Sequence, residues 1–454
     1  MYKIALLTPL HPQKTGIADY IEEMLPYLRN AFGNEYQIDL FVDDCKPNNE
    51  DTVSNHKIFE IDSYEDVHKD YDLTIYQIGN NGFHFKIYKL ALKYPGIVVL
   101  HDYAIHHMVA AIFLEQMKND TAYLEEVRYN HGRKAKDLAF QRFAKGELGL
   151  WETNAIEYPM NRRIISSSLG AIVFSQFAKE HLETYGCNVP IHRVYLHCGG
   201  ECEKCSDKER DAARKRLNIE TAPNETVIGV FGFVGKTKRP YSILEAVNNL
   251  TQQGKKIKLI YIGQLLDDCK DLPKCIEQMG LSSQVKLTGF TTHEEFQDYL
   301  LASDICISLR YPTMGETSGV LMRALSKGKP SIVTNVGTFQ EFSDDMVIKI
   351  NHDENEIDEL IQSIKQLIED KHFRNSIAAN SLQYAKAHLE IESTAQSFAQ
   401  FIKEAVAYNR IKDNAMYQAV KNKISDVYSG LNYVDDEFLE HATNILVEMF
   451  GGTE

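Results

Sequence analysis

The chain has 454 residues and a mass of 51.8 kDa, enough for two or three domains that each have a core. Hydrophobic residues make up 44% of it and charged residues 25%, values that exclude a disordered or fibrous protein. The formal net charge of -15, from 49 basic and 64 acidic residues, argues against a nucleic-acid partner. No apolar run approaches the ~20 residues that span a bilayer, so we do not expect an integral membrane protein.

The opening segment, MYKIALLTPL, predicts a strand that runs into a turn. It lacks the basic end and long apolar core of a signal peptide, so we expect a cytoplasmic protein. Eight cysteines are too few for a disulfide scaffold. His197, Cys198, Cys202 and Cys205 nevertheless have a spacing that could hold zinc or an iron–sulfur cluster. Because this group follows a strand where a domain linker is expected, we favour free thiols over a metal site.

Short β-rich runs alternate with amphipathic helical patterns along most of the chain. The first series of strands reads KIALLTP, IDLFVDD, LTIYQI, GIVVLHD and AIVFSQ. The second series reads TVIGVFGFVG, KIKLIYIG, QVKLTGF, DICISLR and SIVTNVG, and a linker near residues 197–222 separates the two. This rhythm predicts an α/β fold with two Rossmann-like, doubly wound domains that face each other. Such sheets bind ligands at the carboxyl ends of their strands, so we expect the ligand in the cleft between the domains.

The expected domains are residues 1–200 and 201–385. The first contains a helical insertion at about 104–165, which is too long for a simple connection. Residues 386–454 form a helical C-terminal segment that returns to the first domain. Apolar residues at helical spacing between Tyr408 and Ile424 favour internal packing over the alternative, a homodimer contact.

The strongest local signal is RYPTMGETSGVLMRALSKGKPSIVTNVG, residues 310–337. A strand ends in a Pro-Thr turn, and the small residues Thr317, Ser318 and Gly319 leave the first N–H groups of the next helix accessible to an anion. Glu316 beside such a site suits hydroxyl groups, such as those of a sugar, better than phosphate alone. A plain helix N-cap explains the same residues equally well.

A second signal is GVFGFVGKTKRP, residues 229–240. Gly232 and Gly235 let backbone approach a ligand closely after the strand. The turn also carries three cations, Lys236, Lys238 and Arg239. At the cleft edge they would neutralise a diphosphate. The segment is neither a dinucleotide fingerprint nor a Walker loop, and a solvated basic turn is the alternative.

Two single residues stand where ligands of such sheets bind. His101, in VVLHDY, lies at the carboxyl end of an apolar strand, although a lone histidine is more often structural. Gly16 lies in the loop between the first strand and the first helix, where it can approach a ligand or serve the turn.

The chain resembles the GT-B glycosyltransferases in six short segments. In chain order they are TPLHPQKTGIADY, VLHDY, FGFVGKTKRP, LTGF, RYPTMGETSG and LSKGKPSIVTNVGTFQE. Among these enzymes the retaining family 4 is the most similar. The likeness covers about residues 1–400 and is most specific over 225–345. It implies transfer of a sugar from a nucleotide diphosphate-sugar to a hydroxyl-bearing acceptor, which is a glycan, a protein or a small molecule. It also implies retention at the anomeric carbon, with no cofactor and no required metal.

Carried onto this chain, the resemblance implies three catalytic residues, His101, Lys238 and Glu316. His101 would contact the donor sugar, Glu316 would hold sugar hydroxyls and Lys238 would pair with the diphosphate. Gly16 would line the acceptor side near the phosphates. The other implied donor-binding residues are Gly235, Lys236, Arg239 and Arg310, the amides of Thr317, Ser318 and Gly319 at the β-phosphate, and Gly289 and Phe290 at the base.

Two positions depart from the family pattern. The glutamate expected eight positions after Glu316, which binds ribose in the family, is replaced by Ala324, and the neighbouring register gives Arg323. The common arginine of the phosphate turn is replaced by Phe233. Its charge would come from Lys236, Lys238, Arg239 or Arg310.

Two alternative functions stay open at this point. A UDP-sugar epimerase-like enzyme of the same fold would act on its donor without an acceptor. A non-catalytic partner subunit would explain the missing glutamate, and it would bind no nucleotide.

Overall fold

The structure is a computed structural model that describes residues 1–184 and 189–408. The chain divides into a large compact unit, Met1–Phe398, and a second unit that starts at Ala399. Both sheets belong to the large unit, and residues 399–408 of the second unit are helical. Most of the segment expected to pack internally or to dimerise lies outside the described residues, including Ile424.

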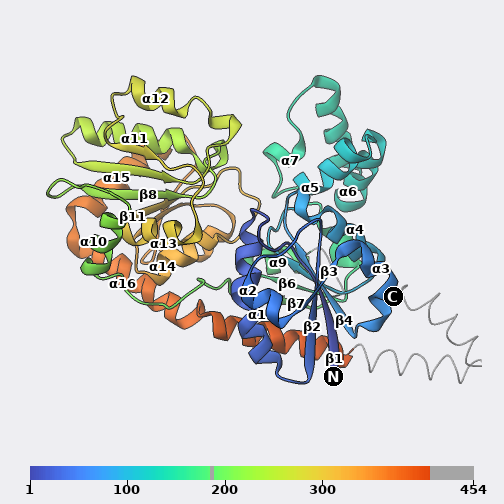
Figure 1. Cartoon of the computed structure of the whole chain (residues 1–454). Coiled ribbons are helices and arrows are strands. Elements are labelled where there is room, and N and C mark those ends of the chain that lie inside the picture. The colour runs from blue at the N-terminus through green and yellow to red at the C-terminus, as the bar shows by residue number, and fades with distance from the viewer. Residues whose placement is uncertain (185–188, 409–454) are drawn as a thin grey trace, which may run out of the picture. The chain divides into compact units, whose positions relative to one another are not determined.

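Within the described chain, seven parallel strands form the first sheet, in the order β3-β2-β1-β4-β5-β6-β7 (Figure 1). Its strands are β1 (Tyr2–Leu7), β2 (Tyr36–Val42), β3 (Lys57–Glu60), β4 (Leu73–Ile78), β5 (Ile97–Leu100), β6 (Gly170–Val173) and β7 (Ile191–Arg193). The strand order reverses at β1, because β2 and β3 lie on one side of it and β4 on the other. Doubly wound sheets bind ligands at such a reversal, next to the carboxyl ends of the strands. The residues that follow β1, β4 and β5 therefore lie at the ligand edge.

Short helices surround the first sheet and alternate with its strands. They are α1 (Gly16–Phe32), α2 (Glu50–Asn55), α3 (Tyr64–Val67), α4 (Phe85–Lys93) and α9 (Gln176–Thr184), with η1 (Ile61–Ser63), η2 (His68–Asp70) and η3 (Gly82–His84). Helix α1 begins where the Thr15 side chain accepts a hydrogen bond from the Ile17 amide. It buries Ile17, Ile21, Leu25 and Leu28, which recur every three or four residues and so share the face that packs on the sheet.

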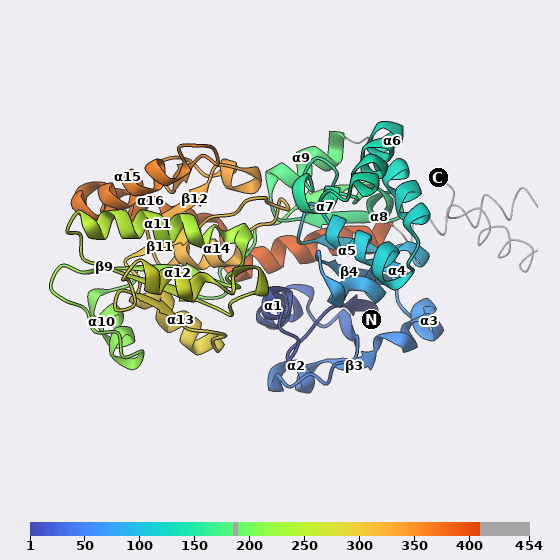
Figure 2. The same ribbon diagram turned by 90° about the horizontal axis from the view of Figure 1, so that it is seen from above.

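Between β5 and β6 the chain forms the helices of the segment that we predicted as an insertion. They are α5 (His106–Ala110), the π-helical η4 (Ala111–Gln116), α6 (Asp120–Lys145), α7 (Leu150–Thr153) and α8 (Arg162–Ser166), which gather beside α4 in Figure 2. Helix α6 bends at Gly132, whose φ of 81° is not helical. Tyr123 and Ile164 of these helices belong to the same buried apolar cluster as Val98 of β5. The helices and the first sheet therefore share one core.

Six parallel strands form the second sheet over the described residues, in the order β10-β9-β8-β11-β12-β13. The strands are β8 (Thr226–Phe231), β9 (Ile257–Ile262), β10 (Val285–Leu287), β11 (Ile305–Ser308), β12 (Ser331–Thr334) and β13 (Ile348–Ile350). This order reverses at β8, so the loops after β8 and β11 flank the second ligand edge. The two parallel sheets with flanking helices confirm the predicted α/β fold class.

Helices cover both faces of the second sheet. The helices are α10 (Asp207–Arg216), α11 (Pro240–Gln252), α12 (Leu272–Gln278), α13 (His293–Ala302), α14 (Gly319–Ser326), α15 (Glu356–Glu369) and α16 (Lys371–His388), with η5 (Lys236–Lys238), η6 (Asp267–Cys269) and η7 (Gly337–Glu341). One buried cluster joins the sheet to α11, α12 and α15, and another joins it to α10, α13 and α14. Figure 1 shows α11 and α12 on one side of β8 and β11, with α13 and α14 on the other.

The chain passes between the two sheets twice. The first passage follows β7, and the second follows α16, where residues 391–398 are helical. The two passages are joined by a hydrogen bond from the Cys198 amide to the Leu389 carbonyl, 3.0 Å long. Thr394 adds a second bond by donating its hydroxyl to the Tyr195 carbonyl over 3.2 Å.

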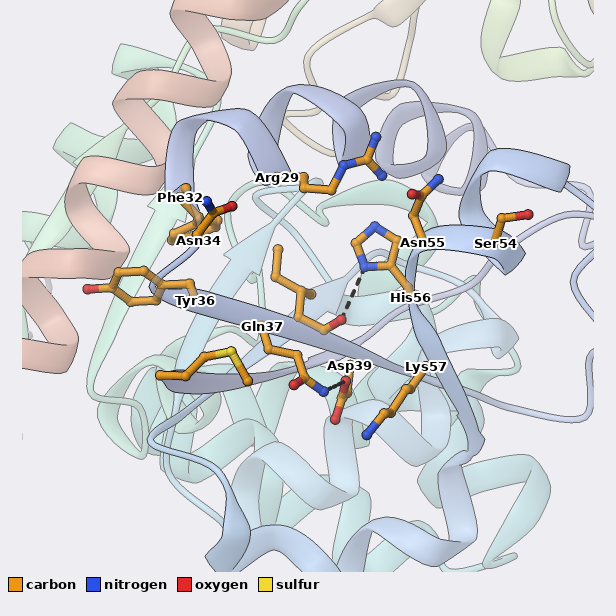
Figure 3. A pocket seen from close by; sticks show the side chains of 13 residues that line it. Arg29, Phe32, Asn34, Tyr36, Gln37, Asp39, Ser54, Asn55, His56 and Lys57 are labelled. Carbon is orange, nitrogen blue, oxygen red and sulfur yellow. Dashed lines mark hydrogen bonds between the residues drawn. The ribbon is translucent and has the colours of Figure 1, made fainter.

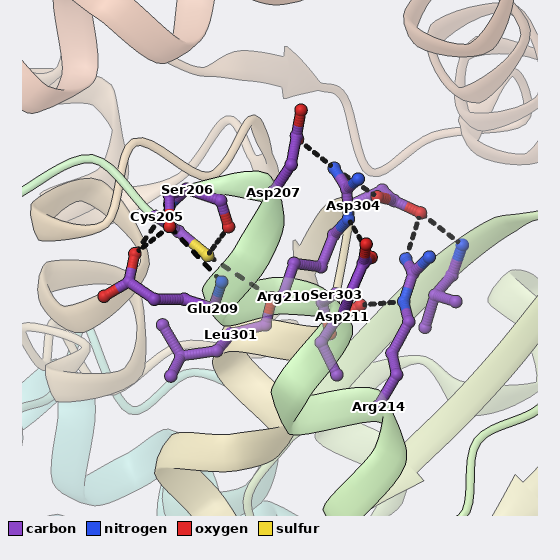
Figure 4. Close-up of polar contacts among 12 residues, drawn as sticks. Cys205, Ser206, Asp207, Glu209, Arg210, Asp211, Arg214, Leu301, Ser303 and Asp304 are labelled. Atoms are coloured by element: carbon purple, nitrogen blue, oxygen red, sulfur yellow. Dashed lines mark hydrogen bonds and ion pairs between the residues drawn. The ribbon is translucent and has the colours of Figure 1, made fainter.

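Helix α10 is fastened to the second sheet by one carboxylate (Figure 4). Asp304 accepts a hydrogen bond from Arg214 of α10 at 2.7 Å and another from the Val227 amide of β8 at 2.8 Å. The side chains of Arg214 and Asp304 are only 12% and 22% exposed, so solvent screens their attraction weakly. Asp304 therefore ties the helix to the first strand of the sheet.

We expect Asp304→Ala to destabilise the protein by about 2–4 kcal/mol, because it leaves the Arg214 charge and the Val227 N–H without their acceptor. Thermal unfolding without ligand measures the loss. The matched control is Asp211→Ala, on the same helix, whose side chain is 63% exposed and whose ion pair with Arg210 is long at 3.7 Å. The control is expected to cost less than about 1 kcal/mol, and equal unfolding temperatures for both variants would contradict this role of Asp304.

Candidate active site

The ligand edge of the first sheet carries His101, directly after β5. Its backbone amide donates to the Ile78 carbonyl at 2.9 Å, which holds the residue beside the end of β4. Its Nε2 lies 2.6 Å from Oε1 of Gln77. Burial, together with the nearby His84 and His197 rings, lowers the pKa of His101 well below its ordinary value. The imidazole is therefore neutral at physiological pH and carries one donor and one acceptor nitrogen.

The β1–α1 loop lies at the same edge. Gly16 is the first residue of α1, and a side chain added there would meet nothing within 4 Å. A side chain would therefore have room at this position, and a ligand contact at Gly16 stays a prediction. Lys14 of the same loop lies with its Nζ 4.5 Å above the ring of Phe290, which follows β10 in the other sheet.

The turn after β8 holds Lys238 in a confined position. Its Nζ donates to the Phe231 carbonyl, and a side chain at Gly232 would lie 2.3 Å from that nitrogen. A side chain at 232 would therefore displace this nitrogen, and the φ of 85° independently favours glycine there. Burial and the neighbouring Arg310 lower the pKa of Lys238 to about 7, while Glu316 opposes this shift.

The other predicted cations of this turn point elsewhere. Arg239 donates from Nε to Oε1 of Glu356, at the start of α15, over 2.9 Å. Lys236 is exposed, and its backbone amide donates to Asp268 at 3.0 Å. Gly235 is buried, and a side chain there would lie 2.9 Å from Leu266. Only Lys238 of the three cations thus lies near Arg310 and Glu316.

Glu316 is only 8% exposed and is surrounded by donors from its own loop. Oε1 pairs with Arg310 at 2.7 Å, and Oε2 accepts from the Thr313 hydroxyl at 2.8 Å and the Met314 amide at 2.7 Å. A carboxylate offers about four acceptor positions, so one remains for a ligand hydroxyl. The side chain is thereby held rigidly in one orientation. Arg310 reaches the site from the end of β11, where its own amide donates to Thr334.

The start of α14 follows directly. Ser318 is the N-cap, and its hydroxyl accepts a hydrogen bond from the Leu321 amide at 3.3 Å. Gly319 is the first helical residue and Thr317 precedes the cap. The N-terminus of α14 thus lies three residues from the Glu316 carboxylate, at the ligand edge of the second sheet. The partial positive charge of a helix start favours an anion here.

The predicted base-binding residues form part of the loop after β10. Gly289 has a φ of 74° and pairs with Gly263 in an isolated β-bridge. Phe290 is 54% exposed and leaves its ring accessible to a flat ligand group.

Three residues that the sequence did not reveal take part in these edges. Gln77 is fully buried and contacts His101, as described above. Burial and the Glu316 charge raise the pKa of Asp102 to about 7, and its Oδ2 accepts from the Asn80 amide at 2.9 Å. Glu341 accepts from the Gln176 and Phe177 amides at the start of α9, at 3.0 and 2.7 Å. The sequence does offer one signal for Asp102, because it directly follows His101 in VVLHDY. Only the histidine of this pair enters the predicted site.

Of the three cysteines of the predicted group, Cys198 and Cys202 lie together and Cys205 lies elsewhere. The sulfur atoms of Cys198 and Cys202 are 3.6 Å apart, and both residues are buried. The Cys205 sulfur instead contacts the Leu301 carbonyl at 3.6 Å (Figure 4). Throughout residues 1–184 and 189–408, no three Cys, His, Asp or Glu side chains are grouped to hold a metal ion. No helix of this described part has the length and apolar character needed to cross a membrane.

Two curated proteins resemble about half of this chain. Over 254 residues it is 20% identical to alpha-D-kanosaminyltransferase of Streptomyces kanamyceticus, covering 56% of this chain and 64% of the relative. Over 221 residues it is 24% identical to D-inositol 3-phosphate glycosyltransferase 1 of Catenulispora acidiphila, covering 46% and 51%. The chain thus spans less than two thirds of both curated relatives.

The solved structure of Anabaena Alr3699/HepE in complex with UDP and glucose has a similar fold. The TM-score is 0.60 at 17% identity, covering 89% of this chain and 100% of that one. The protein therefore has the GT-B fold. Residues 210–384 match the model of a family described as glycosyl transferases group 1.

This part of the chain is thus similar to the glycosyl transferases of group 1. The family match begins within α10 and ends within α16, so it contains Lys238, Arg310 and Glu316. His101 and Gly16 lie outside the matched range, on the first sheet.

Arg323 directly precedes Ala324, the position at which the resemblance implies a second glutamate. Arg323 donates to both carboxylate oxygens of Glu23, at 2.7 and 2.8 Å, and to the Cys198 carbonyl at 3.3 Å. Glu23 belongs to α1 of the first sheet, so this arginine joins the two sheets instead of offering a carboxylate.

A surface hollow of about 490 Å³ lies at the opposite edge of the first sheet (Figure 3). It lies between the last turn of α1, with Arg29, the start of β2 and the end of α2. His56 points its ring toward the Ile38 carbonyl, 3.1 Å away, and Gln37 contacts Asp39. Because this hollow borders the amino end of β2, it is separate from the ligand edge described above.

We expect Gly315→Ala to perturb the ligand edge more than strain alone would. Gly315 has a φ of 68°, and an added Cβ would lie 2.7 Å from Cβ of Tyr103. Gly146→Ala is the matched control, because its φ is 66° and no atom lies within 4 Å of the added carbon. The control pays only the backbone cost of about 1 kcal/mol. Thermal unfolding should show a clearly larger loss for Gly315→Ala, and equal losses would contradict the Tyr103 contact.

Proposed function

We propose that the protein is a retaining glycosyltransferase that moves a sugar from a nucleotide diphosphate-sugar to a hydroxyl-bearing acceptor. One observation carries the proposal. The Lys238 ammonium, the Arg310–Glu316 pair and the start of α14 occupy one edge of the second sheet. Cations and helix amides suit a diphosphate, and a buried carboxylate beside them suits sugar hydroxyls. The group 1 match and the UDP and glucose of the Anabaena protein support the same donor class.

In this proposal the donor diphosphate lies against Lys238 and the first amides of α14, from Thr317 to Gly319. Glu316 accepts a sugar hydroxyl at its remaining position, and His101 contacts the same sugar from the first sheet. The nucleotide base lies at Gly289 and Phe290. The exposed Phe290 ring offers the flat apolar surface that a base stacks on.

The chemistry follows from charge. Cleavage of the anomeric C–O bond releases a diphosphate and leaves a cation-like sugar. Lys238 and the α14 amides stabilise the departing oxygens, and preorganised donors of this kind contribute roughly 3–4 kcal/mol each. The acceptor attacks from the leaving-group side, so the configuration is retained, and a departing phosphate oxygen takes the acceptor proton. No protein nucleophile is required by this route.

The site needs no resident cofactor in this scheme, because protein cations carry the task that a divalent metal performs elsewhere. The acceptor is a hydroxyl-bearing glycan, protein or small molecule. We place the reaction in the cytoplasm, supported by a cysteine content too low for a disulfide scaffold.

Product analysis tests the proposal. The protein is incubated with a panel of UDP- and GDP-sugars, with and without a mixture of hydroxyl acceptors. Mass spectrometry detects a transferred sugar, and NMR of the anomeric proton shows whether its configuration is retained. A product formed equally well without acceptor would favour the epimerase-like alternative. Absence of UDP and GDP binding by calorimetry would favour a non-catalytic subunit and overturn the proposal.

We expect Lys238→Ala to lower the transfer rate by about 100-fold or more, because a preorganised cation at the leaving group is lost. Glu316→Gln should lower it as well, since an amide cannot keep the Arg310 ion pair and offers a weaker acceptor to a sugar hydroxyl. Steady-state transfer assays measure both effects. Circular dichroism and unfolding temperature serve as fold controls, and full activity in both folded variants would contradict the assigned site.

The affinity for a UDP-sugar should fall as the pH rises through the pKa of Lys238, which is about 7 in the free protein. The lysine binds a diphosphate only when charged, so affinity is highest below this pKa and falls by at most about tenfold per pH unit above it. Lys238→Arg keeps its charge throughout and should show a flat profile. Calorimetry with UDP-glucose from about pH 6 to about pH 9 compares the two. A wild-type profile as flat as that of the variant would contradict this role.

A further inference from the structure

We infer that Gln77 is a positioning residue that fixes His101 in its Nε2–H tautomer, so that Nδ1 accepts a hydrogen bond from a donor-sugar hydroxyl. The inference rests on the proposed function for the identity of the ligand. The tautomer itself is a property of the free protein and can be measured without any ligand.

The first step is the contact between the two side chains. Gln77 lies near the end of β4 and is fully buried. Its Oε1 lies 2.6 Å from Nε2 of His101, a short hydrogen bond. An amide oxygen only accepts, so the hydrogen of the neutral imidazole belongs on Nε2.

The second step is that the ring has no freedom to turn. Tyr20 meets the His101 ring edge-on with centroids 5.1 Å apart, and Phe174 lies at 4.9 Å. Both aromatic side chains are buried, at 4% and 5% exposure. With Nε2 directed at Gln77, the ring presents Nδ1 as its acceptor nitrogen. Within the described chain, the recorded hydrogen bonds of the His101 side chain involve Nε2 alone.

The third step is that Gln77 is itself held in place. Its backbone carbonyl accepts from Nδ1 of His84 at 2.9 Å, and His84 is fully buried. Burial lowers the pKa of His84 to about 4, so this ring is neutral as well. A neutral His84 donates through Nδ1 and adds no positive charge beside His101. Two neutral rings and one amide thus form a chain of fixed donors and acceptors.

The fourth step is that the Gln77 amide destabilises the fold, because one of its polar atoms is buried without a partner in the described part of the chain. Among the described residues, the buried Nε2 of Gln77 has no hydrogen-bond partner, and an unsatisfied buried donor is destabilising. Methionine, of similar length and without polar atoms, would avoid this cost inside the same core. The amide therefore lowers stability relative to such an apolar side chain, and in return its oxygen supplies the contact with His101 that methionine would lack.

The tautomer has a consequence for the ligand. An acceptor nitrogen at Nδ1 requires a hydroxyl that donates to it, so the sugar must carry a free hydroxyl where it meets His101. A deoxy or fluoro sugar at that position lacks the donor and should be transferred more slowly. A phosphate or carboxylate at that position would instead be repelled by the lone pair.

The first experiment measures the tautomer. The free protein is labelled with ¹⁵N-histidine, and the His101 signals are identified by their absence in His101→Phe. Long-range ¹H–¹⁵N spectra then distinguish Nε2–H from Nδ1–H. We expect Nε2–H in the wild type and in Gln77→Glu, and a mixture of tautomers in Gln77→Met. Nδ1–H in the wild type would overturn the inference, whatever the activity.

The second experiment measures transfer. Gln77→Met should lower kcat by about tenfold, while the dissociation constant of UDP changes less than about twofold, because the nucleotide does not contact His101. Thr74→Val is the matched control. Thr74 is also buried on β4 and bonds to the Tyr64 hydroxyl at 2.7 Å, but it does not contact His101. It should change kcat little, and equal losses in both variants would reduce Gln77 to a structural role and overturn the inference.

The Gln77→Glu variant tests the pH dependence of activity, which a change in packing alone would not alter. A carboxylate in place of the amide keeps Nε2–H and raises the pKa of His101, against the effects of burial, His84 and His197. The charged imidazolium has no acceptor at Nδ1, so activity should be lost below the raised pKa and recover above it. If the activity of Gln77→Glu at low pH follows the same profile as that of the wild type, the inference is contradicted. If the expected tautomers are found but no donor is transferred, the proposed function fails while the positioning role stands.

Discussion

A lysine held against a backbone carbonyl determines the character of the second sheet's ligand edge. Lys238 is enclosed between the Phe231 carbonyl and the space that Gly232 leaves free, and it bonds to a peptide oxygen instead of a carboxylate. Burial and the neighbouring Arg310 charge, which Glu316 only partly offsets, lower the pKa of Lys238 to about 7. Under the proposed function, an incoming diphosphate would supply a negative charge at this position. The free energy of that neutralisation would then be available to binding and to leaving-group stabilisation.

The two ligand edges follow the same design with different chemistry. On the second sheet, Arg310, Thr313 and the Met314 amide hold Glu316 in one orientation. On the first sheet, an amide oxygen and two aromatic rings hold His101. In both cases a side chain that contacts the donor sugar under the proposed function is already oriented in the free protein. Preorganisation of this kind reduces the entropy that must be lost during the reaction.

The fold was predictable because parallel strands are buried on both faces and so read as continuous apolar runs, such as TVIGVF in β8 and LTIYQI in β4. The confirmed group 1 resemblance likewise depends on local motifs. The resemblance singled out Lys238 among the cations of the turn, but the pairing of Arg239 was not predictable. Arg239 is drawn away by Glu356, which lies 117 residues later, and no local pattern reports that pairing. Gln77 was hidden for the same reason, because inside a strand it looks like one more buried position and its partner lies 24 residues away.

The paired passages of the chain between the sheets have a mechanical consequence. Because the Cys198 amide bonds to the Leu389 carbonyl, the two segments must bend together. Two chain segments that are held side by side in this way bend together more easily than they twist. Any change in the angle between the two sheets must therefore bend both passages at once.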